Sequence, residues 1–133
     1  MKSTTKTWLT LAKNDLSLAK DLAKKKGRYH YSVHFCHQAL EKTLKALISE
    51  RTRLQPYPTH NFKILLDQSG IKDIPDNIKI FLISMTPHYI GTKYPEDIAN
   101  LYKKYTQSTS VEILKRTTEV TKWLEALAKS KKS

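Results

Sequence analysis

The chain has 133 residues, 39% of them hydrophobic, and a formal net charge of +12, which suits one domain with one core. The single cysteine, Cys36, excludes an internal disulfide framework and a cysteine-based zinc cluster, and the three glycines form no phosphate-binding loop. No apolar run approaches the roughly 18 residues that a membrane span requires, and no secretory signal pattern is found, so we expect a cytoplasmic protein.

Two long helices are predicted in the first half of the chain. Apolar residues recur every three or four positions from Trp8 to Ala23, which predicts a helix over residues 4–25 with one buried face. The next helix, over residues 29–50, carries apolar side chains on two sides, and a helix of this kind lies at the centre of a bundle. Cys36 falls on one of these apolar stripes and is therefore expected to be an inert core thiol.

The predicted central helix also carries polar side chains. Gln38, Glu41, Lys42 and Lys45 are interspersed among its apolar residues. Because a buried polar group costs free energy unless it has a partner, these side chains must reach partners or a cleft. We therefore expect function to reside near them.

A connection and a short helix follow. Residues 51–58 are predicted to be extended because Pro56 and Pro58 restrict the backbone there. Thr59 is the predicted N-cap of a helix over residues 60–68, which a serine and a glycine close.

The second half of the chain is predicted to contain two more helices. One begins after Pro75 and ends at Pro87, and residues 88–107 are expected to be irregular or only partly helical. A capping box with Thr109 as N-cap then opens the last helix, over residues 111–129.

These elements define a fold class, since no alternating strand pattern and no internal repeat is found. We predict an all-α fold, an up-and-down antiparallel bundle of the four-helix type with a short extra helix. We expect residues 1–129 to form a single domain and residues 130–133 to be a frayed lysine-rich tail.

Four short motifs occur in order along the chain. They are Trp8 with Ala12, Asp15 and Leu16; the run from His37 to Leu47; Thr59-His60 followed by Leu65-Leu66; and Tyr89 with the run Thr92-Lys93-Tyr94-Pro95-Glu96. In this order they resemble the motifs of the HEPN family, including its central Gln-Ala-x-Glu-Lys-x-x-Lys-Ala motif.

The resemblance implies a small helical bundle related to the substrate-binding domain of nucleotidyltransferases, such as the C-terminal domain of kanamycin nucleotidyltransferase. Members of the family are often encoded beside a minimal nucleotidyltransferase and usually form homodimers, and many serve in toxin–antitoxin or defence systems. One branch consists of RNases with an Arg-x4–6-His motif. Other branches lack this motif and are regarded as nucleotide-binding proteins or partner subunits.

The RNase motif is missing where the resemblance places it, around residues 90–97. Arg28-x5-His34 and Arg53-x6-His60 match its spacing elsewhere, but the first pair flanks a helix start and the second spans two prolines. Neither pair is predicted to align a general base with a cation. We assign no catalytic residue, and an RNase toxin with a degenerate Arg/His site remains an alternative.

The candidate nucleotide- or phosphate-binding residues come from the resembling motifs. They are Gln38, Lys42, Lys45, His60, Tyr89, Lys93 and Tyr94. The lysines supply charge for phosphate, and the tyrosines supply stacking surface for a base.

Each of these candidates also has a structural interpretation. Glu41 and Lys45 have the i,i+4 spacing of an ordinary helical ion pair, His60 is placed to cap a turn, and the tyrosines can pack on the helix before them. His30 and His34 have the spacing of a metal pair, but no carboxylate or cysteine supports them, so no metal site is predicted.

The uneven charge agrees with an anionic ligand. Residues 54–107 carry only +1 of the +12, and the rest belongs to residues 1–53 and 108–133. Such a surface favours nucleic acid, although a lysine-rich surface also serves solubility. We predict a non-catalytic HEPN-type accessory protein without a cofactor, a homodimer that binds a nucleotide or RNA and pairs with a minimal nucleotidyltransferase. A structural homodimer without ligand is the third alternative.

Overall fold

The structure is a computed structural model that describes residues 1–93 and 97–130, without the side chains of Ile90 and Lys93. Within these residues all the regular elements are helices, which confirms the predicted all-α fold. They are α1 (Ser3–Leu22), α2 (Tyr29–Arg51), α3 (Phe62–Ser69), α4 (Asp76–Lys93), α5 (Ile98–Lys104) and α6 (Gln107–Lys129).

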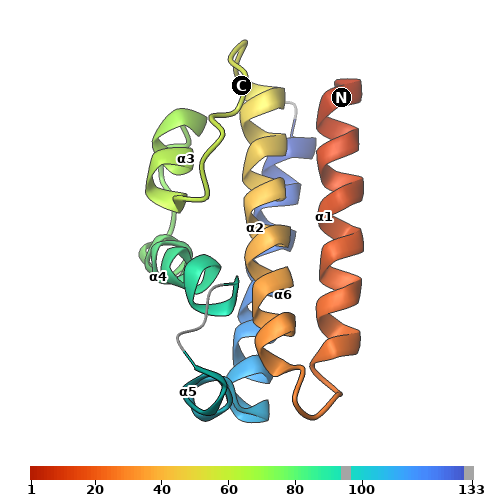
Figure 1. The fold of residues 1–133 in the computed structure, drawn as a ribbon. Coiled ribbons are helices and arrows are strands. Elements are labelled where there is room, and N and C mark those ends of the chain that lie inside the picture. Colours follow the sequence, from red (N-terminus) through yellow and green to blue (C-terminus); the bar gives the residue numbers. More distant parts are fainter. Residues whose placement is uncertain (94–96, 131–133) are drawn as a thin grey trace.

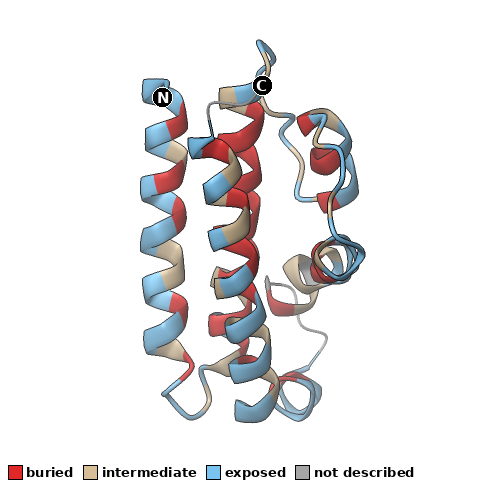
Figure 2. Ribbon diagram, turned by 180° about the vertical axis from the view of Figure 1, so that it is seen from behind, coloured by how far each residue is buried: buried red, intermediate tan, exposed pale blue. Residues whose placement is uncertain are grey.

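The helix α2 lies at the centre of the bundle. It packs against α1 and α6 on one side and against α3, α4 and α5 on the other (Figure 1). Fourteen of its 23 residues are buried, and Figure 2 shows it red along most of its length, whereas α1 is blue on its outer side. The two-sided apolar pattern therefore predicted the position of α2 correctly.

The core thiol behaves as the sequence predicted. Cys36 is fully buried between α2 and its neighbours, and burial raises the pKa of its thiol to about 12. The side chain therefore stays protonated and unreactive at neutral pH. No helix in the described part of the chain combines the length and hydrophobicity that a membrane span needs.

The prediction that Pro87 ends the fourth helix is wrong, because α4 continues to Lys93. Proline removes its own N–H donor, but contacts beyond it hold the last turns in place. Thr92 Oγ1 lies 3.1 Å from His34 Nδ1 on α2, and His88 Nδ1 lies 2.8 Å from Tyr105 Oη. Tertiary contacts therefore outweigh the local signal.

The stretch expected to be irregular is also more ordered than predicted. Besides the end of α4, it contains α5, whose N-cap Asp97 accepts a hydrogen bond from the Asn100 amide at 2.8 Å. Leu101 and Tyr105 are buried against the bundle. The tyrosines that suggested an irregular segment instead place α5 against the start of α2.

Two predicted helix caps lie a few residues from the observed ones. The N-cap of α3 is Asn61, which accepts from the Ile64 amide at 3.1 Å, whereas Thr59 accepts from the Asn61 amide one step earlier. The N-cap of α6 is Thr106 instead of Thr109. In both places several side chains could cap the helix, and the geometry of the preceding chain selects one of them.

Replacing the observed cap of α6 should therefore cost more than replacing the predicted one. Thr106 accepts from the Thr109 amide at 3.2 Å, so we expect Thr106→Ala to lower the free energy of unfolding by about 1 kcal/mol. Thr109→Ala should cost less than about 0.5 kcal/mol, as surface substitutions usually do. Urea unfolding followed by circular dichroism measures both, and equal losses would contradict the cap assignment.

Candidate functional site

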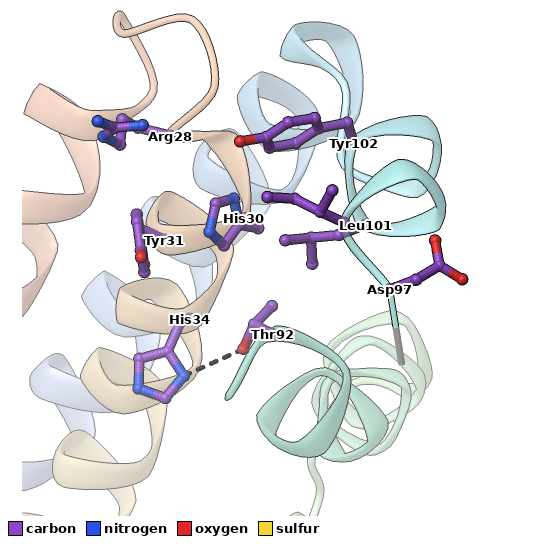
Figure 3. A pocket seen from close by; sticks show the side chains of 9 residues that line it. Arg28, His30, Tyr31, His34, Thr92, Asp97, Leu101 and Tyr102 are labelled. Carbon is purple, nitrogen blue, oxygen red and sulfur yellow. Dashed lines mark hydrogen bonds between the residues drawn. The ribbon is translucent and has the colours of Figure 1, made fainter. Parts of the chain in front are cut away.

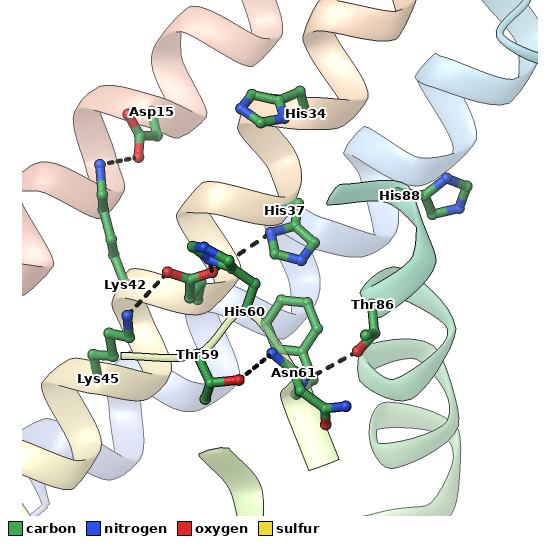
Figure 4. Close-up of polar contacts among 12 residues, drawn as sticks. Asp15, His34, His37, Lys42, Lys45, Thr59, His60, Asn61, Thr86 and His88 are labelled. Carbon is green, nitrogen blue, oxygen red and sulfur yellow. Dashed lines mark hydrogen bonds and ion pairs between the residues drawn. The ribbon is translucent and has the colours of Figure 1, made fainter. Parts of the chain in front are cut away.

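A buried carboxylate in the middle of α2 organises the residues of the central motif. Glu41 is 5% exposed, and its two oxygens have different partners. Its Oε1 lies 2.7 Å from His60 Nδ1, and its Oε2 accepts a hydrogen bond from Lys45 Nζ at 3.1 Å. Since His60 belongs to the connection before α3, the carboxylate joins that connection to α2 (Figure 4).

Two aromatic rings next to this carboxylate form what we call the His60–Tyr89 pair. Their centroids are 3.8 Å apart and their planes differ by 14°, so the rings are stacked. Nearly half of the His60 side chain, 45%, is exposed. Because Nδ1 faces Glu41, the Nε2 edge of the His60 ring is the one turned away from the carboxylate. The pair therefore offers a flat aromatic surface, and the contact with Glu41 fixes the orientation of the His60 ring.

A buried histidine, His37, lies next to both rings of the pair. The ring of His37 is completely buried and lies 5.4 Å from the ring of Tyr89 and 4.7 Å from that of Phe62. Burial lowers the pKa of His37 to about 4, so it is neutral at pH 7. His37 Nδ1 lies 3.8 Å from Glu41 Oε1, too far for a hydrogen bond. Among the described residues, neither ring nitrogen of His37 has a hydrogen-bond partner, and the same is true of Gln38 Oε1. Such unpaired buried atoms are rare and tend to cluster where structure serves function.

The two lysines predicted to bind phosphate both have acidic partners. Lys42 Nζ lies 2.6 Å from Asp15 Oδ2 and ties α2 to α1, while Lys45 is 8% exposed and bound to Glu41. Figure 4 shows Lys42 reaching toward Asp15, away from His60. The structure thus brings Gln38, Lys45, His60 and Tyr89 to one region. It directs Lys42 elsewhere.

Two further predicted residues fall outside the described part of the chain. They are Tyr94 and, for its side chain, Lys93. The predicted binding set is therefore only partly assembled, around the Glu41 carboxylate.

A cavity of about 400 Å³ lies between the start of α2, the end of α4 and the helix α5. Its lining includes Arg28, Tyr31, His34, Thr92 and Tyr102 (Figure 3). His34 links the cavity to the pair, because its Nδ1 lies 3.1 Å from Thr92 Oγ1 and its ring lies 5.8 Å from that of Tyr89. The volume and the mixture of aromatic and polar side chains are typical of a small-molecule site.

Sequence reasoning missed most of these lining residues. Arg28 and His34 matched the RNase spacing but were not expected to share a cavity, and Tyr31 and Tyr102 had no assigned role. The available signal was the alternation of cations and aromatic residues where the second helix begins. The helix α5, which supplies Tyr102 from the other side, was not predicted.

Comparison with known proteins agrees with this architecture. The HEPN domain pattern matches residues 5–127. The crystal structure of TT1696 from Thermus thermophilus has the same fold, with a TM-score of 0.80 and 23% sequence identity, and the match covers 95% of this chain and 99% of that chain. No curated protein matches the sequence.

Proposed function

The chain belongs to the HEPN domain family, and from this premise we propose that it is a non-catalytic accessory protein that binds a nucleotide or nucleic acid. Its partner in this proposal is a minimal nucleotidyltransferase, in a toxin–antitoxin or defence pair. The observation that carries the proposal is the His60–Tyr89 pair, whose histidine is held by Glu41 of the family's central motif.

The geometry of the pair suits a nucleobase. A base stacked on an exposed aromatic ring contributes about 1–3 kcal/mol to binding, and a ring that is already held in place loses little freedom on binding. Glu41 holds His60 through a 2.7 Å contact at the edge of the ring, and Tyr89 stacks on one face of the ring. The outer edge of His60 adds a polar atom that can recognise a base.

The charge of the chain supports an anionic ligand. Lys42 and Lys45 are paired with carboxylates, so the phosphates must be met by other cations. Arg28 lines the adjoining cavity and is exposed. A ligand with its base on the pair and its phosphate toward the cavity would use both features.

Exposed apolar side chains support partner binding. Leu11 and Leu18 on α1 and Ile80 and Ile83 on α4 are all turned to solvent. Apolar side chains of this kind are candidates for coverage by a second copy or by another subunit. Co-expression with a minimal nucleotidyltransferase, followed by size-exclusion chromatography, tests the pairing.

Ligand binding should appear as thermal stabilisation. A ligand at 100 times its dissociation constant should raise the free energy of unfolding by about 2.7 kcal/mol. We expect this shift with ATP, GTP or a short RNA in the wild type, and its loss in Tyr89→Ala, because the stacked surface is removed. Trp8, whose ring lies 5.6 Å from Lys45 Nζ, gives a fluorescence signal for the same titration.

The matched control is Tyr57→Ala, which removes a half-exposed tyrosine from the connection before α3 and leaves the His60–Tyr89 pair in place. It should leave the ligand-induced shift unchanged when each variant is compared with its own ligand-free baseline. If neither nucleotides nor RNA stabilise the wild type, the proposal fails, and a structural homodimer without ligand becomes the better interpretation.

RNA cleavage is the second candidate, because Arg28 and His34 line the same cavity. They lie six residues apart, about 9 Å along a helix axis, and Figure 3 shows them at opposite ends of the labelled group. Cleavage of RNA by the purified protein, abolished by Arg28→Gln and by His34→Gln, would replace the non-catalytic proposal.

A further inference from the structure

The turn between α1 and α2 concentrates positive charge at one end of the bundle. Lys24, Lys25, Lys26 and Arg28 fall within five residues, and all four are exposed. The tight turn depends on Gly27, whose φ of +78° lies in the left-handed region. Among the residues that the structure describes, none of these four cations has an ion-pair partner. They differ in this from Lys42 and Lys45.

Aromatic rings share cavity linings with two of these cations, Arg28 and Lys26. Tyr31 at the start of α2 is 46% exposed, and Tyr102 on α5 is 45% exposed. Figure 3 shows the Tyr102 ring pointing toward the start of α2, level with Arg28 and on the opposite side from Arg28 and Tyr31. Cations interleaved with exposed aromatic rings are the surface that single-stranded nucleic acids use.

Tyr102 stands between two cavities. The first is the cavity of about 400 Å³ lined by Arg28 and Tyr31, and the second, of about 370 Å³, is lined by Lys26 and Tyr29. Tyr102 lines both. Two neighbouring cavities that share one aromatic wall can hold two successive bases of a strand, whereas a single nucleotide would fill only one.

Buried side chains pack behind the walls of these cavities. His30 is 7% exposed, and its ring lies 4.0 Å from that of Tyr31 and 6.2 Å from that of Tyr102. Burial and then the Arg28 charge lower the pKa of His30, so it stays neutral and adds no charge of its own. In the second cavity, the buried Tyr105 is fixed by His88 at 2.8 Å.

One acidic residue, Asp97, also lines the first cavity. Its two oxygens accept hydrogen bonds from the Asn100 amide and the Asn100 side chain, at 2.8 and 2.9 Å. Asp97 therefore acts as the cap of α5, and its oxygens already have donors. The positive charge of the turn dominates this end of the molecule.

We propose that this end of the bundle binds a single-stranded polynucleotide, with bases on either side of Tyr102 and phosphates along Lys24, Lys25, Lys26 and Arg28. The inference rests on the proposed function in its choice of a nucleic-acid ligand. It extends that site from the His60–Tyr89 pair, through the cavity that Arg28 lines, to the turn between α1 and α2, and it selects a strand over a mononucleotide. A duplex is excluded from this mode, because its bases are paired and cannot enter the cavities.

Fluorescence anisotropy with labelled ten-nucleotide oligouridylate and oligothymidylate tests the proposal and separates RNA from DNA. Tyr102→Ala should weaken binding about five- to hundred-fold, because a stacked base loses its support. Tyr102→Phe should retain most of the affinity. Replacing Lys24, Lys25 and Lys26 together with glutamine should flatten the plot of log affinity against log salt concentration by about 2, since each phosphate contact with a single strand contributes about 0.7.

The matched control replaces Lys6, Lys63 and Lys79 with glutamine. These exposed lysines lie on α1, α3 and α4, away from the turn, and the change in net charge is the same. The control should bind the strand nearly as tightly as the wild type. If both triple variants lose affinity equally, only net charge matters and the inference is overturned.

Other results would also overturn it, in distinguishable ways. If Tyr89→Ala abolishes strand binding while the turn variants bind normally, the inference fails and the proposed function stands. If the wild type binds no strand but binds vesicles containing phosphatidylserine, the turn recognises a lipid surface. If the wild type binds neither nucleotides nor strands, both proposals fail. Circular dichroism confirms that each variant is folded.

Discussion

Replacing Glu41 with alanine should lower the free energy of unfolding by about 3–5 kcal/mol, the usual cost of breaking a buried ion pair from one side. The side chains of Glu41 and Lys45 are 7% and 10% exposed. Without the carboxylate, the Lys45 ammonium would remain buried with its charge uncompensated. His60 would lose the 2.7 Å contact that orients its ring. Urea denaturation at pH 7 measures the loss.

A surface ion pair provides the control for Glu41. Lys13 Nζ lies 3.1 Å from Glu125 Oε1, and the Lys13 side chain is 63% exposed. Lys13→Ala should therefore cost less than about 1 kcal/mol. The double replacement of Glu41 by leucine and Lys45 by methionine should recover much of the loss, because no unpaired charge stays behind. A cost below about 1 kcal/mol for Glu41→Ala would mean that water already reaches Lys45.

Acidification from pH 7 to 4.5 should remove about 2.5 kcal/mol of stability through His37 alone. Burial lowers the pKa of this histidine from 6.5 in the unfolded chain to about 4 in the fold. Between these two pKa values, the His37 side chain is protonated in the unfolded chain but neutral in the folded chain. The contribution of His37 is therefore fully present above pH 6.5 and is lost as the pH falls toward 4.

The comparison with His37→Phe isolates this effect. Phenylalanine keeps a ring against Phe62 and removes both ring nitrogens, which have no hydrogen bond among the described residues. The variant should therefore lose the His37 share of the pH dependence. Burial also lowers the pKa values of His30 and His88. These two groups contribute the same pH dependence to the wild type and to His37→Phe, so their contribution cancels in the comparison. The difference between the two stability curves, measured by urea unfolding from pH 4.5 to 7, is the quantity to test. Parallel curves would contradict the assignment.

Much of the fold follows from apolar periodicity. The two-sided pattern of residues 29–50 predicted a central helix, and α2 is the most buried of the long helices. The order of four short motifs along the chain also predicted the family. The match of the HEPN domain pattern to residues 5–127 confirms this prediction. Helix ends were less predictable. The contacts of Thr92 with His34 and of His88 with Tyr105 carry α4 past Pro87, and no local signal contains them.

The candidate site was predictable in its residue types but not in its pairings. The sequence by itself determined that polar side chains interrupt the apolar faces of α2. It also determined that these side chains must find partners, because burying them without partners would cost too much free energy. Only the tertiary structure decided that Lys42 meets Asp15 of α1, that Glu41 holds His60, and that Tyr102 faces the start of α2. These contacts join residues far apart in the chain, and their distances depend on how whole helices pack.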